Sequence, residues 1–108
     1  MVKFAILFHT PKNLQTFENG YNGFLAAVET MPNITRRQVN TIIGSPMQNS
    51  PFYRVLELYF DDFEALNAAL NSENGQKAGL AMMNSFEQGS FETFFADVYE
   101  EAGARTEP

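Results

Sequence analysis

Cysteine and tryptophan are absent from this chain of 108 residues, and histidine occurs once. The lack of cysteine excludes disulfides and thiolate metal ligands, and a single imidazole leaves little from which to build a metal site. Neighbouring carboxylates such as Asp61 and Asp62 are more typical of helix caps and solvated surfaces than of metal ligands. We therefore expect no metal, and a chain without cysteine suits the reducing cytoplasm.

Positive charge is also scarce, with seven lysines and arginines against thirteen acidic residues and a net charge of -6. The basic residues are scattered apart from Arg36 and Arg37, which argues against a nucleic-acid partner. The apolar stretch near the N-terminus is too short to cross a membrane, and no basic amphipathic helix is expected to lie on one. Glycine-rich phosphate loops and dinucleotide-binding spacings are missing, so we expect no cofactor.

Aromatic residues are plentiful: eleven phenylalanines and four tyrosines, in a chain that is 44% hydrophobic. This is enough to fill one dense core, and the length fits one domain. We expect that domain to span residues 1–100. Residues 101–108 read as a polar, acidic and flexible C-terminal tail.

Alternating apolar residues predict four strands, at residues 2–9, 34–43, 52–60 and 91–100. The second strand is rich in polar side chains, which is typical of a sheet edge. The third is apolar on both faces. One of its alternating sets includes Phe52, Leu56, Leu58 and Phe60, and the other includes Tyr53, Val55 and Tyr59. A strand of this kind is expected at the centre of a sheet that is covered on both sides.

Apolar residues spaced by three and four predict a first helix: Leu14, Phe17, Tyr21, Phe24, Val28 and Met31. Asn13 is placed to cap its start, and Pro32 ends it. Gly20 and Gly23 inside this helix either admit a closely packed neighbour, which we favour, or make room for a ligand.

A second helical region follows the third strand, with Asp61 or Asp62 as its cap. Residues 71–75 interrupt it or shift its axis, and a further helical piece runs to about Phe86.

The order β-α-β-β-α-β predicts an α+β fold of the ferredoxin-like type. Right-handed crossovers place the first and third strands in the middle of the sheet and the polar second strand at an edge. The helices then cover one face only. The other face retains apolar side chains, so we expect a homodimer in which two sheets face each other and form a barrel.

Two residues are candidates for catalysis. His9, the only imidazole, follows a central strand just before a loop, where a general acid or base is well placed. Glu57 lies in the middle of the third strand, where a carboxylate needs a partner. For Glu57 we favour an ion pair with Arg37 or Arg54 at the dimer interface over a role inside a cavity.

The chain resembles the EthD family of dimeric α+β barrel proteins over nearly its whole length. The stretches that carry the resemblance are MVKFAILFHTP at the start, FENGYNGFLAAVETMP at residues 17–32, and FYRVLELYFDDFEALNAALNSENGQKAGLAMMNSF at residues 52–86. The third is the most specific, because the run Ser72, Gly75, Ala78 follows the strand and its helix as in family members. The resemblance implies the dimeric barrel derived above.

The first helix departs from the family pattern. When the chain is aligned on Pro32, Phe17 and Tyr21 match the aromatic pair of typical members, but Phe24 falls where they have a histidine. Ala26 and Ala27 replace the Pro-Leu that follows that histidine. A phenyl ring neither transfers protons nor binds metal. We therefore expect Phe24 to make the pocket more apolar.

Two functions remain open. The one we favour is binding of a small hydrophobic molecule, with no catalytic role or an accessory one, in a pocket between the sheet and the helices. Its expected ligand-binding residues are Tyr21, Phe24, Tyr53 and Tyr59. The alternative is a cofactor-independent enzyme of the monooxygenase, cyclase or dehydratase type, acting on a hydrophobic or aromatic substrate. Its acid or base would be His9, Glu57 or a tyrosine.

Overall fold

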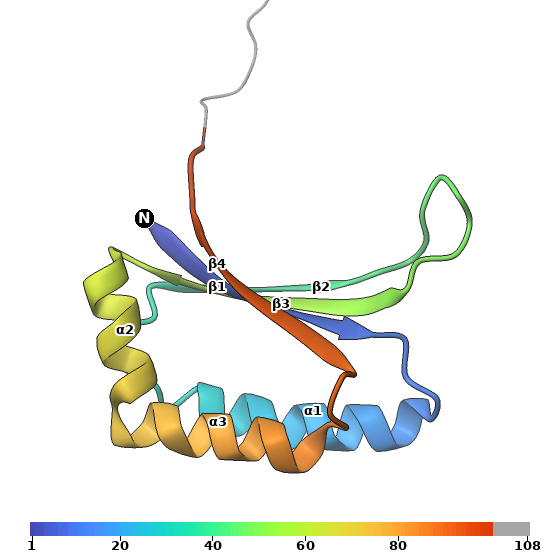
Figure 1. Cartoon of the computed structure of the whole chain (residues 1–108), viewed down its shortest axis with the longest axis horizontal. Coiled ribbons are helices and arrows are strands. Elements are labelled where there is room, and N and C mark those ends of the chain that lie inside the picture. Colours follow the sequence, from blue (N-terminus) through green and yellow to red (C-terminus); the bar gives the residue numbers. More distant parts are fainter. Residues whose placement is uncertain (101–108) are drawn as a thin grey trace, which may run out of the picture.

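A computed structural model describes residues 1–100 and contains the strands and helices expected from the sequence (Figure 1). The elements are β1 Val2–His9, α1 Leu14–Val28, β2 Arg36–Thr41, β3 Phe52–Phe60, α2 Phe63–Asn71, α3 Glu73–Ser85 and β4 Phe91–Asp97. The second helical region is thus split into α2 and α3, as the polar interruption at residues 71–75 suggested. The acidic tail predicted for residues 101–108 lies outside the described residues.

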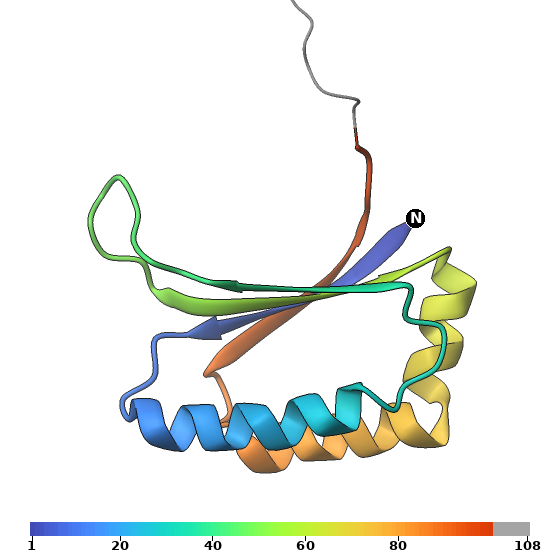
Figure 2. The ribbon, with the colours of Figure 1, turned by 180° about the vertical axis from the view of Figure 1, so that it is seen from behind.

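The strands form one antiparallel sheet in the order β2-β3-β1-β4. The prediction that the first and third strands lie at the centre is confirmed, as is the polar edge strand, since every residue of β2 is exposed. All three helices lie on the same side of this sheet (Figures 1 and 2). This is the ferredoxin-like α+β architecture. Within residues 1–100, none of the helices is long and apolar enough to cross a membrane.

The last strand is shorter than predicted, because it ends at Asp97 and not at residue 100. Its partner β1 begins at Val2, which pairs with Asp97. Beyond that point one bond remains, from the Val98 N–H to the Met1 carbonyl at 2.9 Å. The strand stops where its neighbour stops.

The face of the sheet that the helices cover carries the core. Paired residues of neighbouring strands point to the same side, so Phe4 with Leu58 and Ile6 with Leu56 face the helices together. Phe17, Tyr21, Phe24 and Val28 of α1 pack against them and are each at most 7% exposed. The stripe predicted for the first helix is its buried face, except at Leu14, which begins the helix and is 52% exposed.

A β-bulge changes the orientation of Tyr53. Phe8 pairs with Arg54 and His9 pairs with Phe52, which leaves Tyr53 as the extra residue on β3. Strict alternation places Tyr53 on the far face with Val55 and Tyr59, and that expectation is wrong. Its hydroxyl reaches a side chain of α1, so Tyr53 and Arg54 both lie on the helix side.

The face of the sheet opposite the helices, which we call the open face, is more polar than predicted from the sequence. It carries Leu7, Val55 and Phe94, but also Lys3 and Glu57 in its middle. Each alternating set of β3 contains one charged residue, Arg54 on the covered face and Glu57 on the open face. An inspection of the apolar residues alone therefore overestimates how apolar the open face is. The open face is therefore a mixed surface and not a wholly apolar one.

The Ser72, Gly75, Ala78 run builds the junction between α2 and α3. The Ser72 hydroxyl donates to the Ala69 carbonyl at 2.6 Å and accepts from the Gly75 N–H at 3.0 Å, so it caps the start of α3. A side chain at Gly75 would place its Cβ 2.0 Å from the Ala69 carbonyl oxygen. Ala78, 4% exposed, then meets the core. The family-like motif is a tight helix-to-helix turn.

Of the two glycines within α1, Gly20 fits the packing alternative. A Cβ there would lie 3.1 Å from the Ser85 carbonyl oxygen, so its absence lets α1 approach the end of α3. Among the described residues, nothing lies within 4 Å of a Cβ at Gly23, and neither alternative gains support there.

Candidate functional site

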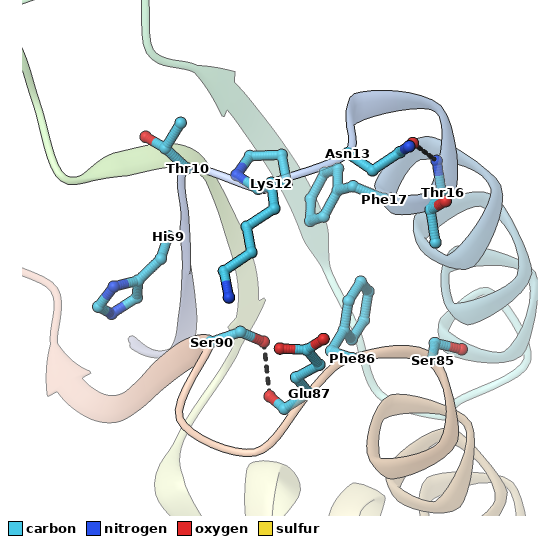
Figure 3. A pocket seen from close by; sticks show the side chains of 11 residues that line it. His9, Thr10, Lys12, Asn13, Thr16, Phe17, Ser85, Phe86, Glu87 and Ser90 are labelled. Carbon is cyan, nitrogen blue, oxygen red and sulfur yellow. Dashed lines mark hydrogen bonds between the residues drawn. The ribbon is translucent and has the colours of Figure 1, made fainter.

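Two cavities lie on the helix side of the sheet, one toward each end of α1. The first, which we call the apolar cavity, has a volume of about 250 Å³. The second, the β1–α1 cavity, has about 230 Å³ and opens beneath the loop that joins β1 to α1 (Figure 3).

The apolar cavity is lined by residues of both central strands and of all three helices. Its lining residues are Phe4, Ile6, Phe24, Val28, Met31, Leu58, Leu70, Gly75, Gln76, Ala78, Gly79 and Met82. Among residues 1–100, none that lines this cavity has an ionisable side chain, and Gln76 supplies its polar side-chain group. Phe24, 2% exposed, contributes a wall. The cavity can hold an apolar molecule but offers it no acid or base.

The β1–α1 cavity has a polar rim and an aromatic wall. The rim includes Thr10, Lys12 and Ser90, and Figure 3 shows the Lys12 side chain running into the opening toward Ser90. Phe17 and Phe86 form the wall.

The shape of that rim is fixed by local hydrogen bonds. The Asn13 side chain caps α1 by accepting from the Thr16 N–H at 2.9 Å, as predicted. The Ser90 hydroxyl donates to the Glu87 carbonyl at 2.6 Å and holds the turn before β4.

His9 belongs to the rim of the β1–α1 cavity, but its imidazole points away from Phe17 and Phe86 (Figure 3). The ring lies 5.2 Å from that of Phe52, and its Nε2 is 2.8 Å from Glu92 Oε2. The side chains are 37% and 58% exposed, so the pair is open to solvent. This arrangement resembles a carboxylate-oriented histidine at the edge of a site.

Glu57 lies on the open face of the sheet, away from both cavities. It pairs with Lys3 Nζ at 2.5 Å and accepts a weaker hydrogen bond from the Asn40 amide at 3.4 Å. The partners expected from the sequence were wrong. Arg37 pairs with Glu29 on the helix side, and Arg54 is turned toward α1 by its position on the covered face.

Arg54 and Glu18 form the ion pair that the sequence analysis missed. Glu18 Oε1 and Oε2 accept from the two terminal guanidinium nitrogens at 2.7 and 3.0 Å, and the Arg54 Nε donates to the Thr41 hydroxyl at 3.2 Å. The Tyr53 hydroxyl donates to Glu18 as well, at 3.1 Å. The hydrogen bonds from Arg54 are the main cause that lowers the pKa of Glu18, against its partial burial.

A signal for this pair was present in the chain. Arg54 shares its alternating set with Leu56, Leu58 and Phe60, which face the helices. An arginine on a covered face needs an anion from the covering helix, and Glu18 follows the buried Phe17 on that helix.

The other tyrosines expected to bind ligand lie apart from the two cavities. Tyr21 is 4% exposed, and the Arg54 guanidinium lies over its ring, 4.6 Å from the ring centre. Burial raises the pKa of the Tyr21 phenol. Within the described residues its hydroxyl has no hydrogen-bond partner. Tyr59 lies on the open face under the Arg36 guanidinium, at 4.2 Å.

The structure therefore separates the predicted site residues. Phe24 lines the apolar cavity and His9 the rim of the β1–α1 cavity, while Tyr21 and Tyr53 lie beneath α1. Glu57 and Tyr59 share the open face. Within residues 1–100 no three side chains of the metal-ligating types His, Cys, Asp and Glu gather in a group that could hold a metal ion.

Comparison with known proteins identifies the family. No family model matches the sequence, and no curated protein does. A solved structure does match: an ethyl tert-butyl ether d (EthD) family protein from Bacillus halodurans is 30% identical, with a TM-score of 0.86 over 92% of this chain and 99% of that one. The chain belongs to the EthD family. The resemblance carried by the sequence motifs is confirmed.

More distant structures share the fold of this EthD family protein. A dimeric ferredoxin-like protein of unknown function from Jannaschia is 14% identical, with a TM-score of 0.64 over 91% of this chain and all of that one. A cofactor-independent oxygenase from Streptomyces nogalater is also 14% identical, with a TM-score of 0.62 over 94% of each chain. At this identity the likeness concerns the fold alone.

The Glu18–Arg54 pair predicts a pH-dependent stability. Because the folded-state pKa of Glu18 is lowered, its stabilising effect is complete above the ordinary glutamate pKa of about 4.3 and is lost as the pH falls through the folded value. Glu18→Gln should lower the free energy of unfolding by about 1.5–3 kcal/mol at neutral pH. The difference from the wild type should shrink on acidification, measured by urea unfolding at a series of pH values.

Glu29→Gln is the matched control. Glu29 lies at the other end of the same helix and pairs with Arg37 at 3.6 Å with 58% of its side chain exposed, so its loss should matter little. An equal effect of both substitutions, or a Glu18→Gln deficit that persists unchanged in acid, contradicts the assignment.

Proposed function

We propose that this EthD family protein binds a small hydrophobic molecule in the apolar cavity. The observation that carries the proposal is the lining of that cavity, in which apolar side chains surround about 250 Å³ without an ionisable group among the described residues. Transfer of apolar surface from water into such a space is favourable. A reaction that needs proton transfer has no group to perform it there.

The place of Phe24 supports binding over chemistry. Typical family members have a histidine at this position of the first helix, and here a phenyl ring faces the cavity instead. The ring contacts Phe8 and Phe86 at centroid distances of 6.4 and 5.9 Å, so it is part of the aromatic packing. The substitution replaces a titratable group with a hydrophobic surface.

Phe24→Ala tests this function. Removal of a fully packed phenylalanine costs about 3–5 kcal/mol, but Phe24 already borders a cavity, so we expect a clearly smaller loss in urea unfolding. The enlarged cavity should accept naphthalene with higher affinity, while toluene should bind the wild type at least as well as the variant. Isothermal titration calorimetry with both probes measures this.

Phe63→Ala is the matched control, because Phe63 begins α2 with half of its side chain exposed and lines neither cavity. It should leave both affinities unchanged. The proposal is wrong if neither probe binds the wild type or Phe24→Ala, or if the two variants respond alike.

We further propose that the protein acts as a homodimer joined through the open faces of two sheets. Related structures such as the Jannaschia protein are described as dimeric. On this chain, Phe94 of the open face is 46% exposed, and Leu7 and Val55 are half-buried. The loop between β2 and β3 projects from the sheet on the side away from the helices (Figure 1), and it carries Ile43 and Met47 almost fully exposed.

A second copy would cover these apolar side chains. The charged residues of the face do not oppose this, because Lys3 and Glu57 already neutralise each other within one chain. A paired and hydrogen-bonded charge is tolerated at an interface where an isolated charge is not.

A charge at the centre of the open face should disrupt assembly. Val55→Asp is expected to cause aggregation or unfolding and not a stable soluble monomer, since the rest of the face would stay uncovered. Leu80→Asp, on the outer side of α3 and already 65% exposed, should leave the dimer intact. Light scattering after size-exclusion chromatography distinguishes these outcomes, and a stable wild-type monomer at micromolar concentration would falsify the proposal.

Catalysis without a cofactor is the second candidate function, and the His9–Glu92 pair at the rim of the β1–α1 cavity favours it. A histidine oriented by a carboxylate can act as a general acid or base. The cytoplasmic location expected from the composition suits either function and stays a prediction.

If a substrate is turned over, its rate should depend on His9. We expect His9→Gln to slow turnover by about 10²–10⁴-fold, the usual contribution of a positioned general acid or base. Glu57→Gln should leave turnover unchanged, because Glu57 lies on the open face away from both cavities. Undiminished turnover in His9→Gln would exclude His9 as the acid or base.

A further inference from the structure

The β1–α1 cavity carries one charge of each sign at its opening. Lys12, from the loop before α1, and Glu87, from the turn after α3, both extend into the opening beside Ser90 (Figure 3). Within residues 1–100 neither of them forms an ion pair, with each other or with another side chain. His9, the remaining ionisable residue of the lining, pairs with Glu92 outside the cavity. The cavity thus offers a ligand two opposite charges.

The backbone that carries these two charges is held by hydrogen bonds. The Glu87 carbonyl accepts from both the N–H and the hydroxyl of Ser90, at 3.0 and 2.6 Å. The Ser90 carbonyl accepts from the His9 N–H at 3.0 Å, which ties the turn after α3 to the end of β1. On the other side, Asn13 caps α1 directly after Lys12. Segments that are anchored before binding reduce the entropy that a ligand must overcome.

Behind the charges lies an aromatic wall that is fixed by packing. The ring of Phe86 contacts those of Phe8, Phe17, Phe24 and Phe91 at centroid distances of 4.8 to 6.2 Å. Such a wall suits a flat apolar group such as an aromatic ring. The cavity volume of about 230 Å³ lies below the roughly 300–1,000 Å³ of pockets for drug-sized ligands, so the ligand that fits is small.

The two charges select the class of this small ligand. A simple anion would meet the Glu87 carboxylate, and a simple cation would meet the Lys12 ammonium, so each would be repelled by one group of the cavity. A zwitterion is attracted by both. An α-amino acid carries a carboxylate and an ammonium on one carbon atom, and its side chain can extend from that atom toward Phe17 and Phe86.

We propose that the β1–α1 cavity is a second ligand site, which takes a free α-amino acid with an aromatic side chain. The carboxylate lies against Lys12, the ammonium against Glu87, and the ring against Phe17 and Phe86. This cavity shares no lining residue with the apolar cavity, so the inference goes beyond the proposed function and does not depend on it.

Isothermal titration calorimetry with L-phenylalanine tests the site. The titration is run at low ionic strength, because salt screens charges that are exposed to solvent. The wild type should bind L-phenylalanine at millimolar concentrations. L-Alanine carries the same charges without the ring, and it should bind at least about tenfold more weakly because it leaves the aromatic wall uncovered.

Two substitutions separate the charges. Lys12→Gln should weaken binding of L-phenylalanine, and of 3-phenylpropanoate, which lacks the ammonium, by about two- to fivefold, the usual range for an exposed ion pair. It should strengthen binding of 2-phenylethylamine, which lacks the carboxylate, because a repelling charge is removed. Glu87→Gln should also weaken L-phenylalanine, but it should strengthen 3-phenylpropanoate and weaken 2-phenylethylamine.

Lys77→Gln and Glu64→Gln are the matched controls. Lys77 lies on α3 and Glu64 on α2, both are exposed, and both line neither cavity. Each control removes the same charge from another part of the surface. The affinities of all three aromatic probes should stay unchanged.

The outcomes distinguish this site from the proposed function. If L-phenylalanine does not bind the wild type while toluene does, the second site is overturned and the apolar cavity is unaffected. If L-phenylalanine binds but Lys12→Gln and Glu87→Gln behave like their controls, it binds elsewhere and the assignment is wrong. If only one of the two substitutions weakens L-phenylalanine, the cavity recognises a single charge and the zwitterion is overturned.

Discussion

The layer between sheet and helices depends on the packing of Phe8. This residue, 1% exposed at the end of β1, has ring contacts with Phe17, Tyr21, Phe24, Phe86 and Phe91, at centroid distances of 4.8 to 6.5 Å. These rings come from α1, the end of α3 and the start of β4, so one side chain ties the central strand to three other segments. The β1–α1 cavity borders this cluster at Phe17 and Phe86, and the apolar cavity borders it at Phe24.

The β-bulge beside Phe8 adds a second donor to the ion pair on the covered face. Arg54 faces α1 through the regular alternation of β3, and the bulge turns Tyr53 to the same side, so that both side chains donate to Glu18. The open face gains a different pair, Lys3 with Glu57. Each face of the sheet thus contains a self-satisfied ion pair, and neither pair points into the apolar cavity. The Glu18–Arg54 pair is therefore satisfied on the covered face without lining the apolar cavity.

Periodicity and crossover rules were enough to predict the fold. The stripe of α1, the cap at Asn13 and the polar edge strand each follow from local chemistry, and the order of the strands follows from them. The orientation of Tyr53 did not, because a bulge depends on pairing between distant segments and alternation assumes its absence. The partner of Glu57 was also predicted wrongly. Lys3 lies on the neighbouring strand β1, and its place beside Glu57 on the same face depends on the pairing of segments far apart in the sequence.

The candidate site was harder to read than the fold because a cavity is what packing leaves empty. No spacing in the sequence announces that Phe24 borders open space while Tyr21, one turn away, is sealed beneath Arg54. What the sequence did indicate is chemical: Phe24 stands where the resemblance to the EthD family implies a histidine. The titratable candidates His9 and Glu57 then lie at the rim of the other cavity and on the far face of the sheet. A molecule held in the apolar cavity is out of reach of both, so the same arrangement that favours binding also limits the chemistry that can follow.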